Sequence, residues 1–194
     1  MPRRTALLAP AFAVAALGCK PTMDDIYAAL PPAGTPVPAF SYTALDGSVV
    51  DAAALRGRPA VVALWSSSCS ASRRALDAIG AMHAAYAPRG AQVVVLADDR
   101  ERPRVDSLLA RAGVRAPVAL TNETTMDTFT HGQSVLPWRK AFALPTFLVL
   151  DAQGRVTYRQ IGIEADPAQQ LGRVRAQVDS LLAQSQPPLT RGAA

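Results

Sequence analysis

A lone cysteine within a serine cluster is the group best suited to do chemistry in this 194-residue sequence. Residues 60–76 read AVVALWSSSCSASRRAL, so Cys69 follows an apolar run and precedes a helical pattern. A thiol at the start of a helix faces unpaired N–H groups and the positive end of the helix dipole, which favour an anion. We therefore expect a lowered thiol pKa and a larger fraction of the thiolate that attacks disulfides. Ser72, three residues later, could donate a hydrogen bond to that thiolate.

The other cysteine, Cys19, ends a segment with the features of a targeting signal. Two arginines precede an uncharged apolar run over residues 5–18, which is too short for a comfortable membrane span. The small and apolar residues before Cys19 resemble the lipobox of bacterial lipoproteins, although Ala16 stands where leucine is usual. The resemblance implies diacylation of Cys19, and two acyl chains suffice for stable anchoring. A signal peptide cut elsewhere and an uncleaved anchor are the alternatives.

These features predict a division of the chain into four parts. We expect a lipoprotein signal peptide over residues 1–18, a proline-rich flexible tether over 19–35, one domain over 36–184 and a disordered tail over 185–194. The expected location is the cell envelope, with the domain facing the periplasm and the choice of inner or outer membrane left open. With Cys19 lipidated, Cys69 would be the one remaining thiol in an oxidising compartment, so no intramolecular disulfide could form.

The composition agrees with a protein that has a single hydrophobic core, and it argues against a nucleic-acid partner. Hydrophobic residues make up 49% of the chain, charged residues 18%, and the formal charge is +5. The arginines are scattered, without a basic run or interleaved aromatic residues, so the positive balance is best interpreted as solvated surface.

The pattern along the chain predicts an α/β domain. Apolar runs at residues 60–65, 91–97 and 116–120 predict buried strands, and the three- and four-residue spacing of apolar positions predicts helices over 70–87 and 105–112. Asp46-Gly47 predicts a tight turn between two extended pieces, and DAQG a second one between residues 146–151 and 155–162. A closing helix is expected over 166–183, with Asp166 as N-cap and Pro167 at its first position. This order favours a central mixed sheet with helices on both faces and an N-terminal β-hairpin extension.

Three matched blocks in the right order resemble the thioredoxin-like superfamily, and within it the redoxin and TlpA-like group of membrane-tethered thiol-disulfide proteins. The family segment F-W-A-T-W-C-x-x-C-R corresponds to residues 64–73, and G-x-P-T followed by F-L-I-D-x-x-G corresponds to residues 143–154. The opening pattern G-x-x-x-P-x-F…D-G…L-x-G-x-P corresponds to residues 34–59. The resemblance covers residues 36–184. It implies a thioredoxin-like fold, a cis Pro145 beside Cys69, and the following substrate groove: Trp65, Ser66, Ser68, Arg73, Leu144 and Thr146.

Departures from the family pattern fall on the resolving half of the reaction. Ser72 replaces the second cysteine, which normally attacks the mixed disulfide and releases product. Ala63 and Ala75 stand where relatives place the carboxylates that accept the proton of the resolving thiol, and Ser68 replaces the aromatic residue beside the nucleophile. A protein of this kind can form mixed disulfides or be oxidised to a sulfenic acid, and it then needs an outside thiol for release.

Three functions fit this sequence. The first is an envelope thiol-disulfide oxidoreductase that acts through Cys69, with Ser72 and Pro145 at its site, on protein thiols and disulfides and with an external thiol reductant. The second is a redox-inert or regulatory binding lipoprotein. The third is a one-cysteine peroxidase, for which Ser66 fits the hydroxyl position of P-x-x-x-T-x-x-C but Val62 replaces the proline. No cofactor is expected and no metal, because neither His83 nor His131 has a ligand partner at metal spacing.

Overall fold

The computed structural model describes residues 22–121, 129, 143–166 and 169–185. At its centre is strand β3 (Ala60–Trp65), all six residues of which are buried. Strands β4 (Gln92–Asp98) and β5 (Val118–Thr121) extend the sheet in parallel on one side of β3. The antiparallel hairpin of β6 (Thr146–Leu150) and β7 (Val156–Ile161) extends it on the other. The strand order β5-β4-β3-β6-β7 is that of a mixed sheet, as predicted.

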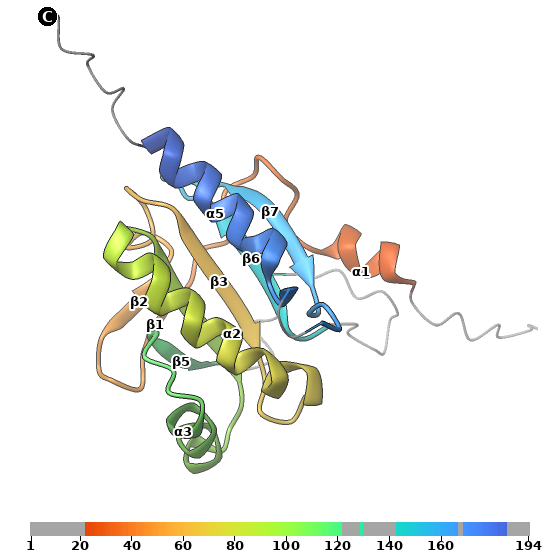
Figure 1. The fold of residues 1–194 in the computed structure, drawn as a ribbon, viewed down its shortest axis with the longest axis vertical. Coiled ribbons are helices and arrows are strands. Elements are labelled where there is room, and N and C mark those ends of the chain that lie inside the picture. The colour runs from red at the N-terminus through yellow and green to blue at the C-terminus, as the bar shows by residue number, and fades with distance from the viewer. Residues whose placement is uncertain (1–21, 122–128, 130–142, 167–168, 186–194) are drawn as a thin grey trace, which may run out of the picture.

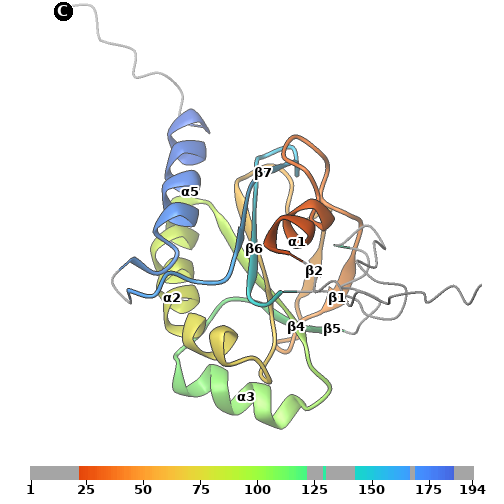
Figure 2. The same cartoon turned by 90° about the vertical axis from the view of Figure 1, so that its right-hand side faces the viewer.

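Alternation along the strands divides the core into two layers. Val61, Ala63 and Trp65 of β3 face the layer formed by α2 (Ser70–Tyr86), α3 (Arg102–Arg111) and α5 (Gly172–Ser185). A short 3-10 turn (Ala87–Arg89) follows α2. Figures 1 and 2 show α2 and α5 side by side across this face of the sheet.

The opposite face packs against the N-terminal part of the chain. Strands β1 (Ser41–Thr43) and β2 (Val49–Asp51) form an antiparallel hairpin, with the Asp46-Gly47 turn between them, as predicted. The hairpin and helix α1 (Met23–Ala29) lie on the side of the sheet away from α2 and α5 (Figure 2). Phe129 also belongs to this layer, where its ring lies 5.5 Å from that of Phe40.

Part of the segment expected to be a flexible tether packs onto the domain. Thr22 and Asp25 form a reciprocal capping box that starts α1, and Leu30 after it is 1% exposed. Arg159 of β7 donates hydrogen bonds to the carbonyl oxygens of Tyr27 and Leu30, at 2.9 and 3.1 Å. Residues 22–35 therefore differ from the extended spacer that their proline content predicted, because a helix cap and a buried leucine fix them to β7.

The closing helix begins later than expected. Leu171 is fully buried with a φ of 59°, and its N–H donates to Glu164 at 2.8 Å. This turn separates Asp166 from α5, so the prediction of a helix with Asp166 as its N-cap is wrong. His131, Pro167, the signal segment and nearly all of the expected tail lie outside the described residues. No helix in the described part of the chain is both long and apolar enough to cross a bilayer.

Candidate active site around Cys69

Cys69 lies where β3 ends and α2 begins. It is the N-cap residue of α2, with extended backbone angles (φ −84°, ψ 123°), and its side chain makes no capping hydrogen bond. The thiol is free and partly exposed. The N–H groups of Ala71 and Ser72, in the first turn of α2, act on the sulfur.

The sheet brings a second segment to the thiol. Strand β6 runs antiparallel to β3 with Thr146 opposite Leu64, which places the residues before Thr146 beside those after Trp65. The Leu144–Pro145 peptide bond is cis, and the Cys69 thiol donates a hydrogen bond to the Leu144 carbonyl oxygen at 3.2 Å. Pro145, which is buried, therefore follows directly after the residue whose carbonyl oxygen contacts the sulfur.

Several groups act on the acidity of Cys69. Partial burial by itself raises the pKa of the thiol, but the N–H groups of Ser72 and Ala71, the Ser72 hydroxyl and the charge of Arg73 lower it. The lowering contributions together exceed the burial cost, so the pKa of Cys69 lies below the ordinary value for a cysteine. The site therefore favours a nucleophilic thiolate.

Ser72 lies next to the sulfur and lowers the pKa of Cys69 through its N–H and its hydroxyl. Its side chain is fully buried, and its hydroxyl oxygen forms no hydrogen bond of normal geometry with any described residue. A buried hydroxyl without a partner is costly. While the thiol hydrogen points to Leu144, the neutral sulfur is a weak acceptor; after deprotonation it becomes a strong one for this hydroxyl.

Three residues expected to line the groove are instead buried. Trp65 is 0% exposed, and its indole Nε1 donates to the Ser72 carbonyl oxygen at 2.7 Å, beneath the first turn of α2. The assignment of Trp65 to a substrate surface is therefore wrong, because residue 65 points into the α2 layer. Ser66 and Thr146 are 4% and 1% exposed, and they too are closed to a side-chain contact with substrate.

The hydroxyls of these buried residues have local partners. Ser66 Oγ lies 2.9 Å from Ser68 Oγ, and Thr146 Oγ1 donates to the Ala143 carbonyl oxygen at 2.6 Å. A one-cysteine peroxidase would need the Ser66 hydroxyl to contact peroxide, but here that hydroxyl contacts Ser68. Ser68, Leu144 and Arg73 are the groove candidates that retain exposed surface.

Sequence reasoning missed the carboxylate that holds the active-site loop. Asp99 accepts hydrogen bonds from the backbone N–H and the hydroxyl of Ser67. The Ser67 carbonyl oxygen in turn accepts from Arg73 at 2.8 Å and from Arg104 at 3.3 Å. One signal could have found Asp99: it follows β4, which is parallel to β3, and the carboxyl ends of neighbouring parallel strands meet at one edge of a sheet.

The positions of the two lost acids are apolar and closed. Ala63 and Ala75 are both 0% exposed and lie in the core layer between the sheet and α2. A methyl group at each position leaves the Cys69–Ser72 pair without the proton acceptors that relatives place there. The described residues also contain no cluster of three or more histidine, cysteine, aspartate or glutamate side chains that could hold a metal ion. Burial lowers the pKa of His83, which favours its neutral form.

Curated proteins similar in sequence are thiol-disulfide oxidoreductases. Two of them are the thiol-disulfide oxidoreductases ResA of Bacillus thuringiensis (strain Al Hakam) and of Bacillus anthracis. Each is 22% identical over 129 residues, which are 66% of this chain and 69% of the relative.

Solved structures share the fold at similarly low identity. A thiol:disulfide interchange protein of the thioredoxin family from Chlorobium tepidum TLS has a TM-score of 0.63 and 24% identity, over 76% of this chain and 96% of its own. A secreted disulfide oxidoreductase of Mycobacterium tuberculosis has a TM-score of 0.53 and 21% identity, over 71% and 95% of the two chains. The thioredoxin-like fold predicted from the sequence is thereby confirmed. The family model named Redoxin matches residues 32–175, well over half of the sequence, and the chain accordingly belongs to the Redoxin family.

Proposed function

We propose that this protein is an envelope thiol-disulfide oxidoreductase that works through Cys69 alone and depends on an external thiol to complete each cycle. The observation that carries this proposal is the contact of the Cys69 thiol with the Leu144 carbonyl oxygen beside Pro145. That contact puts the sulfur against a backbone segment able to dock an extended substrate chain. The names of the relatives, which are thiol-disulfide oxidoreductases, agree with the reaction class.

The chemistry follows from the groups around the sulfur. The Cys69 thiolate attacks a disulfide of a partner protein, forms a mixed disulfide and releases one partner thiolate. In relatives a second cysteine then attacks the mixed disulfide, but Ser72 has no thiol to do so. Ser72 instead stabilises the Cys69 thiolate, both before attack and when it leaves. Release of the second partner sulfur requires a thiol from outside the chain.

Location at the membrane belongs to the same proposal. It is supported by the lipobox-like residues before Cys19, which lie outside the described part of the structure. Lipid on Cys19 would hold the domain close to envelope proteins, which are the proposed partners. Labelling cells with a palmitate analogue tests this part: the protein should carry label, and Cys19→Ser should not.

The reaction is tested by alkylation and exchange kinetics in the full chain with Cys19→Ser, in which Cys69 is the sole thiol. The rate of alkylation against pH should rise with an apparent pKa below that of a free cysteine, because the thiolate is the reacting form. The same protein should exchange with a small aromatic disulfide faster than a model thiol does. An unshifted, slow thiol would remove the proposal.

A redox-inert binding lipoprotein is the second candidate, and the loss of every resolving group is the observation that favours it. Ser72, Ala63 and Ala75 have all departed from the family pattern, while the contact of Cys69 with Leu144 beside Pro145 is present. This function expects Cys69→Ala to leave the cellular phenotype of the protein intact. A null phenotype in that variant would exclude it and favour the oxidoreductase.

A further inference from the structure

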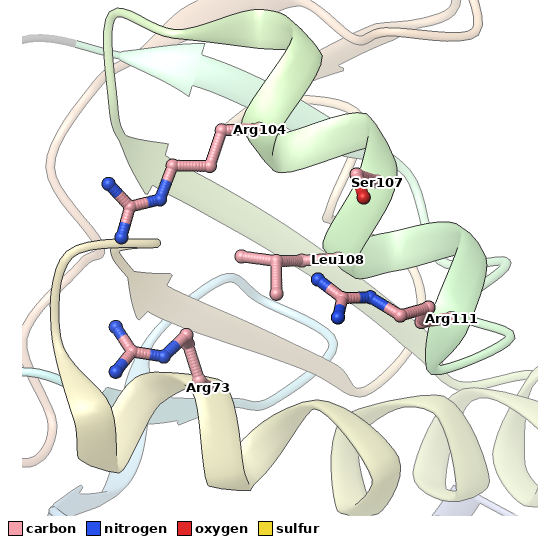
Figure 3. Close-up of a pocket in the computed structure, with 5 residues that line it drawn as sticks. All are labelled: Arg73, Arg104, Ser107, Leu108 and Arg111. Atoms are coloured by element: carbon pink, nitrogen blue, oxygen red, sulfur yellow. The ribbon is translucent and has the colours of Figure 1, made fainter.

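A pocket lined by three arginines opens between the start of α2 and helix α3. Its volume is about 320 Å³, and its lining residues are Arg73, Arg104, Ser107, Leu108 and Arg111. Figure 3 shows Arg73 on α2 and the other four on α3, with Leu108 between the arginines. None of the described residues that line the pocket is acidic.

The three guanidinium groups have no carboxylate partner among the described residues. The ion pairs of the described residues join Arg89 to Asp179 and Arg102 to Asp106, and none of these four side chains lines the pocket. Arg73 and Arg104 donate to backbone carbonyl oxygens, and Arg111 makes neither an ion pair nor a hydrogen bond within the described structure. Three like charges around one small cavity repel one another, and a bound anion would relieve that repulsion.

The pocket is linked to the nucleophile through Arg73. This side chain donates to the Ser68 carbonyl oxygen at 3.2 Å, next to Cys69 in the chain, and its charge acts on the thiol. Arg104 joins the same loop through the Ser67 carbonyl oxygen, at 3.3 Å. An anion held by these arginines would therefore lie beside the loop that carries the reactive sulfur.

The size and composition of the pocket favour a small ligand. A volume near 320 Å³ is at the lower end of the range for small-molecule sites. Guanidinium groups pair with carboxylates through two parallel hydrogen bonds, and the Ser107 hydroxyl and Leu108 methyl groups add one polar and one apolar contact. The proposed mechanism needs a resolving thiol from outside the chain, and a small thiol that carries carboxylates would suit the charge of this pocket.

We propose that the arginine pocket binds the carboxylate end of a small thiol, and that this thiol resolves the mixed disulfides of Cys69. The inference rests on the proposed oxidoreductase function. The bound thiolate attacks Cys69 Sγ in the mixed disulfide; the new sulfur–sulfur bond forms as the bond to the partner breaks, and the partner leaves as a thiolate that takes up a proton. A second small thiol attacks the resulting adduct, releasing a small disulfide and the Cys69 thiolate. Two small thiols thus supply the two electrons that reduce one partner disulfide.

The test uses a neutral mixed disulfide and two thiols of different charge. The full chain with Cys19→Ser is joined at Cys69 to 2-thiopyridine, and release of 2-thiopyridone is followed after addition of glutathione or of 2-mercaptoethanol. Each rate is divided by the rate of the same thiol with a model cysteine mixed disulfide. The corrected ratio of glutathione to 2-mercaptoethanol should exceed one by about tenfold at low salt and fall as salt is added.

Arginine variants locate the effect. Arg111→Gln should lower the corrected ratio about threefold, as expected for one exposed charge pair, and Arg104→Gln with Arg111→Gln about tenfold. Arg74→Gln removes the same charge from α2 outside the pocket and should leave the ratio unchanged. S-methylglutathione, which has the carboxylates but no thiol, should slow the glutathione reaction and not that of 2-mercaptoethanol.

Failure of this inference is distinguishable from failure of the proposed function. A ratio near one, or an equal fall in the Arg74→Gln variant, overturns the pocket proposal while Cys69 remains reactive. The same variants are also compared in their exchange with the disulfide of an acidic peptide. If they slow only that exchange and leave the glutathione ratio unchanged, the pocket proposal is overturned. If Cys69 does not exchange with 2,2′-dithiodipyridine faster than a model thiol, the oxidoreductase function itself fails.

Discussion

The two halves of the active-site loop differ in what they retain. On the attacking side, Cys69 begins α2, contacts the Leu144 carbonyl oxygen and has a lowered pKa. On the resolving side, the buried Ser72 has a hydroxyl where relatives have a thiol. At the two positions where relatives have a proton-accepting carboxylate, this chain has the buried methyl groups of Ala63 and Ala75. The comparison teaches that the groups that favour an attacking thiolate are present here without the groups that relatives use for resolution.

The same comparison explains why Ser72 is not simply a lost residue. Its carbonyl oxygen accepts from the Trp65 indole, and its N–H and hydroxyl lower the pKa of Cys69. Under the proposed function, Ser72 would therefore support the nucleophile instead of resolving its mixed disulfide.

The largest expected effect is the loss of all exchange in Cys69→Ser. The hydroxyl has neither the acidity nor the nucleophilicity of the thiol, so no mixed disulfide can form. The measurement is the reaction of the Cys19→Ser chain, with and without Cys69→Ser, with a small aromatic disulfide. The double variant has no cysteine and serves as the blank; a Cys19→Ser chain that exchanges no faster than this blank would contradict the assignment of Cys69 as the nucleophile.

The next largest effect comes from restoring a thiol on the resolving side with Ser72→Cys. An intramolecular thiol acts at a high effective concentration, so a mixed disulfide at Cys69 should release its partner about a hundredfold faster than in the parent without added thiol. Ser70→Cys, on the exposed side of the same turn, is the matched control and should accelerate release much less. Equal acceleration by both would show that position 72 is not aligned with the sulfur.

Removal of the indole donor by Trp65→Phe should cost stability rather than reactivity. The change removes the hydrogen bond from Nε1 to the Ser72 carbonyl oxygen and leaves a small cavity in the α2 layer. The expected loss is about 1–3 kcal/mol in the free energy of unfolding, measured with denaturant. A direct role of Trp65 in substrate binding would instead lower exchange rates at unchanged stability.

The smallest expected effect is that of Ser72→Ala on acidity. Burial raises the pKa of Cys69, and the hydroxyl of Ser72 is one of the groups that lower it, so its removal should raise the pKa. At a pH below the pKa, alkylation should slow a few-fold, because less thiolate is present. Stability of the reduced, protonated form should not fall, since the hydroxyl has no regular partner there. Ser70→Ala, an exposed neighbour, is the control.

The lowered pKa also gives the sign of a stability change. A thiol whose folded pKa lies below its unfolded value stabilises the fold above the unfolded pKa, and this contribution is lost as pH falls through the folded pKa. As the pH rises from the folded to the unfolded pKa of the thiol, the reduced Cys19→Ser chain should therefore gain free energy of unfolding relative to the same chain with Cys69→Ser.

Much of the fold could be predicted from the sequence because its signals are local. Continuous apolar runs gave the three parallel strands, and Asp46-Gly47 gave the N-terminal hairpin. The start of α5 could not be predicted, because the Asp166-Pro167 signature is overridden by the buried Leu171 and its hydrogen bond to Glu164. The residue at which a helix begins depends on tertiary packing, and the pattern of residue types along the chain carries no information on that packing.

The position of Cys69 could be predicted from the order of the sequence patterns around it. The face of β3 to which each neighbouring side chain points was not predicted. Cys69 at a helix start follows from the apolar run before it and the helical pattern after it, whereas Leu144-Pro145 beside it was expected only from the resemblance to the family. Trp65 was assigned to the groove through the resemblance to the family, but alternation along β3 turns its side chain inward. The arginine pocket joins residues from two helices, so nothing in either segment alone indicated it.

Trapping of Cys69 partners in intact cells tests the central claim most directly. Cells are quenched with acid and an alkylating agent, and the protein is recovered and separated with and without reduction. We predict envelope proteins joined to Cys69 by reducible bonds, absent in Cys69→Ser and held longer than in Ser72→Cys. Recovery of Cys69 only as a free thiol, with no attached partner in either variant, would contradict a single-cysteine oxidoreductase.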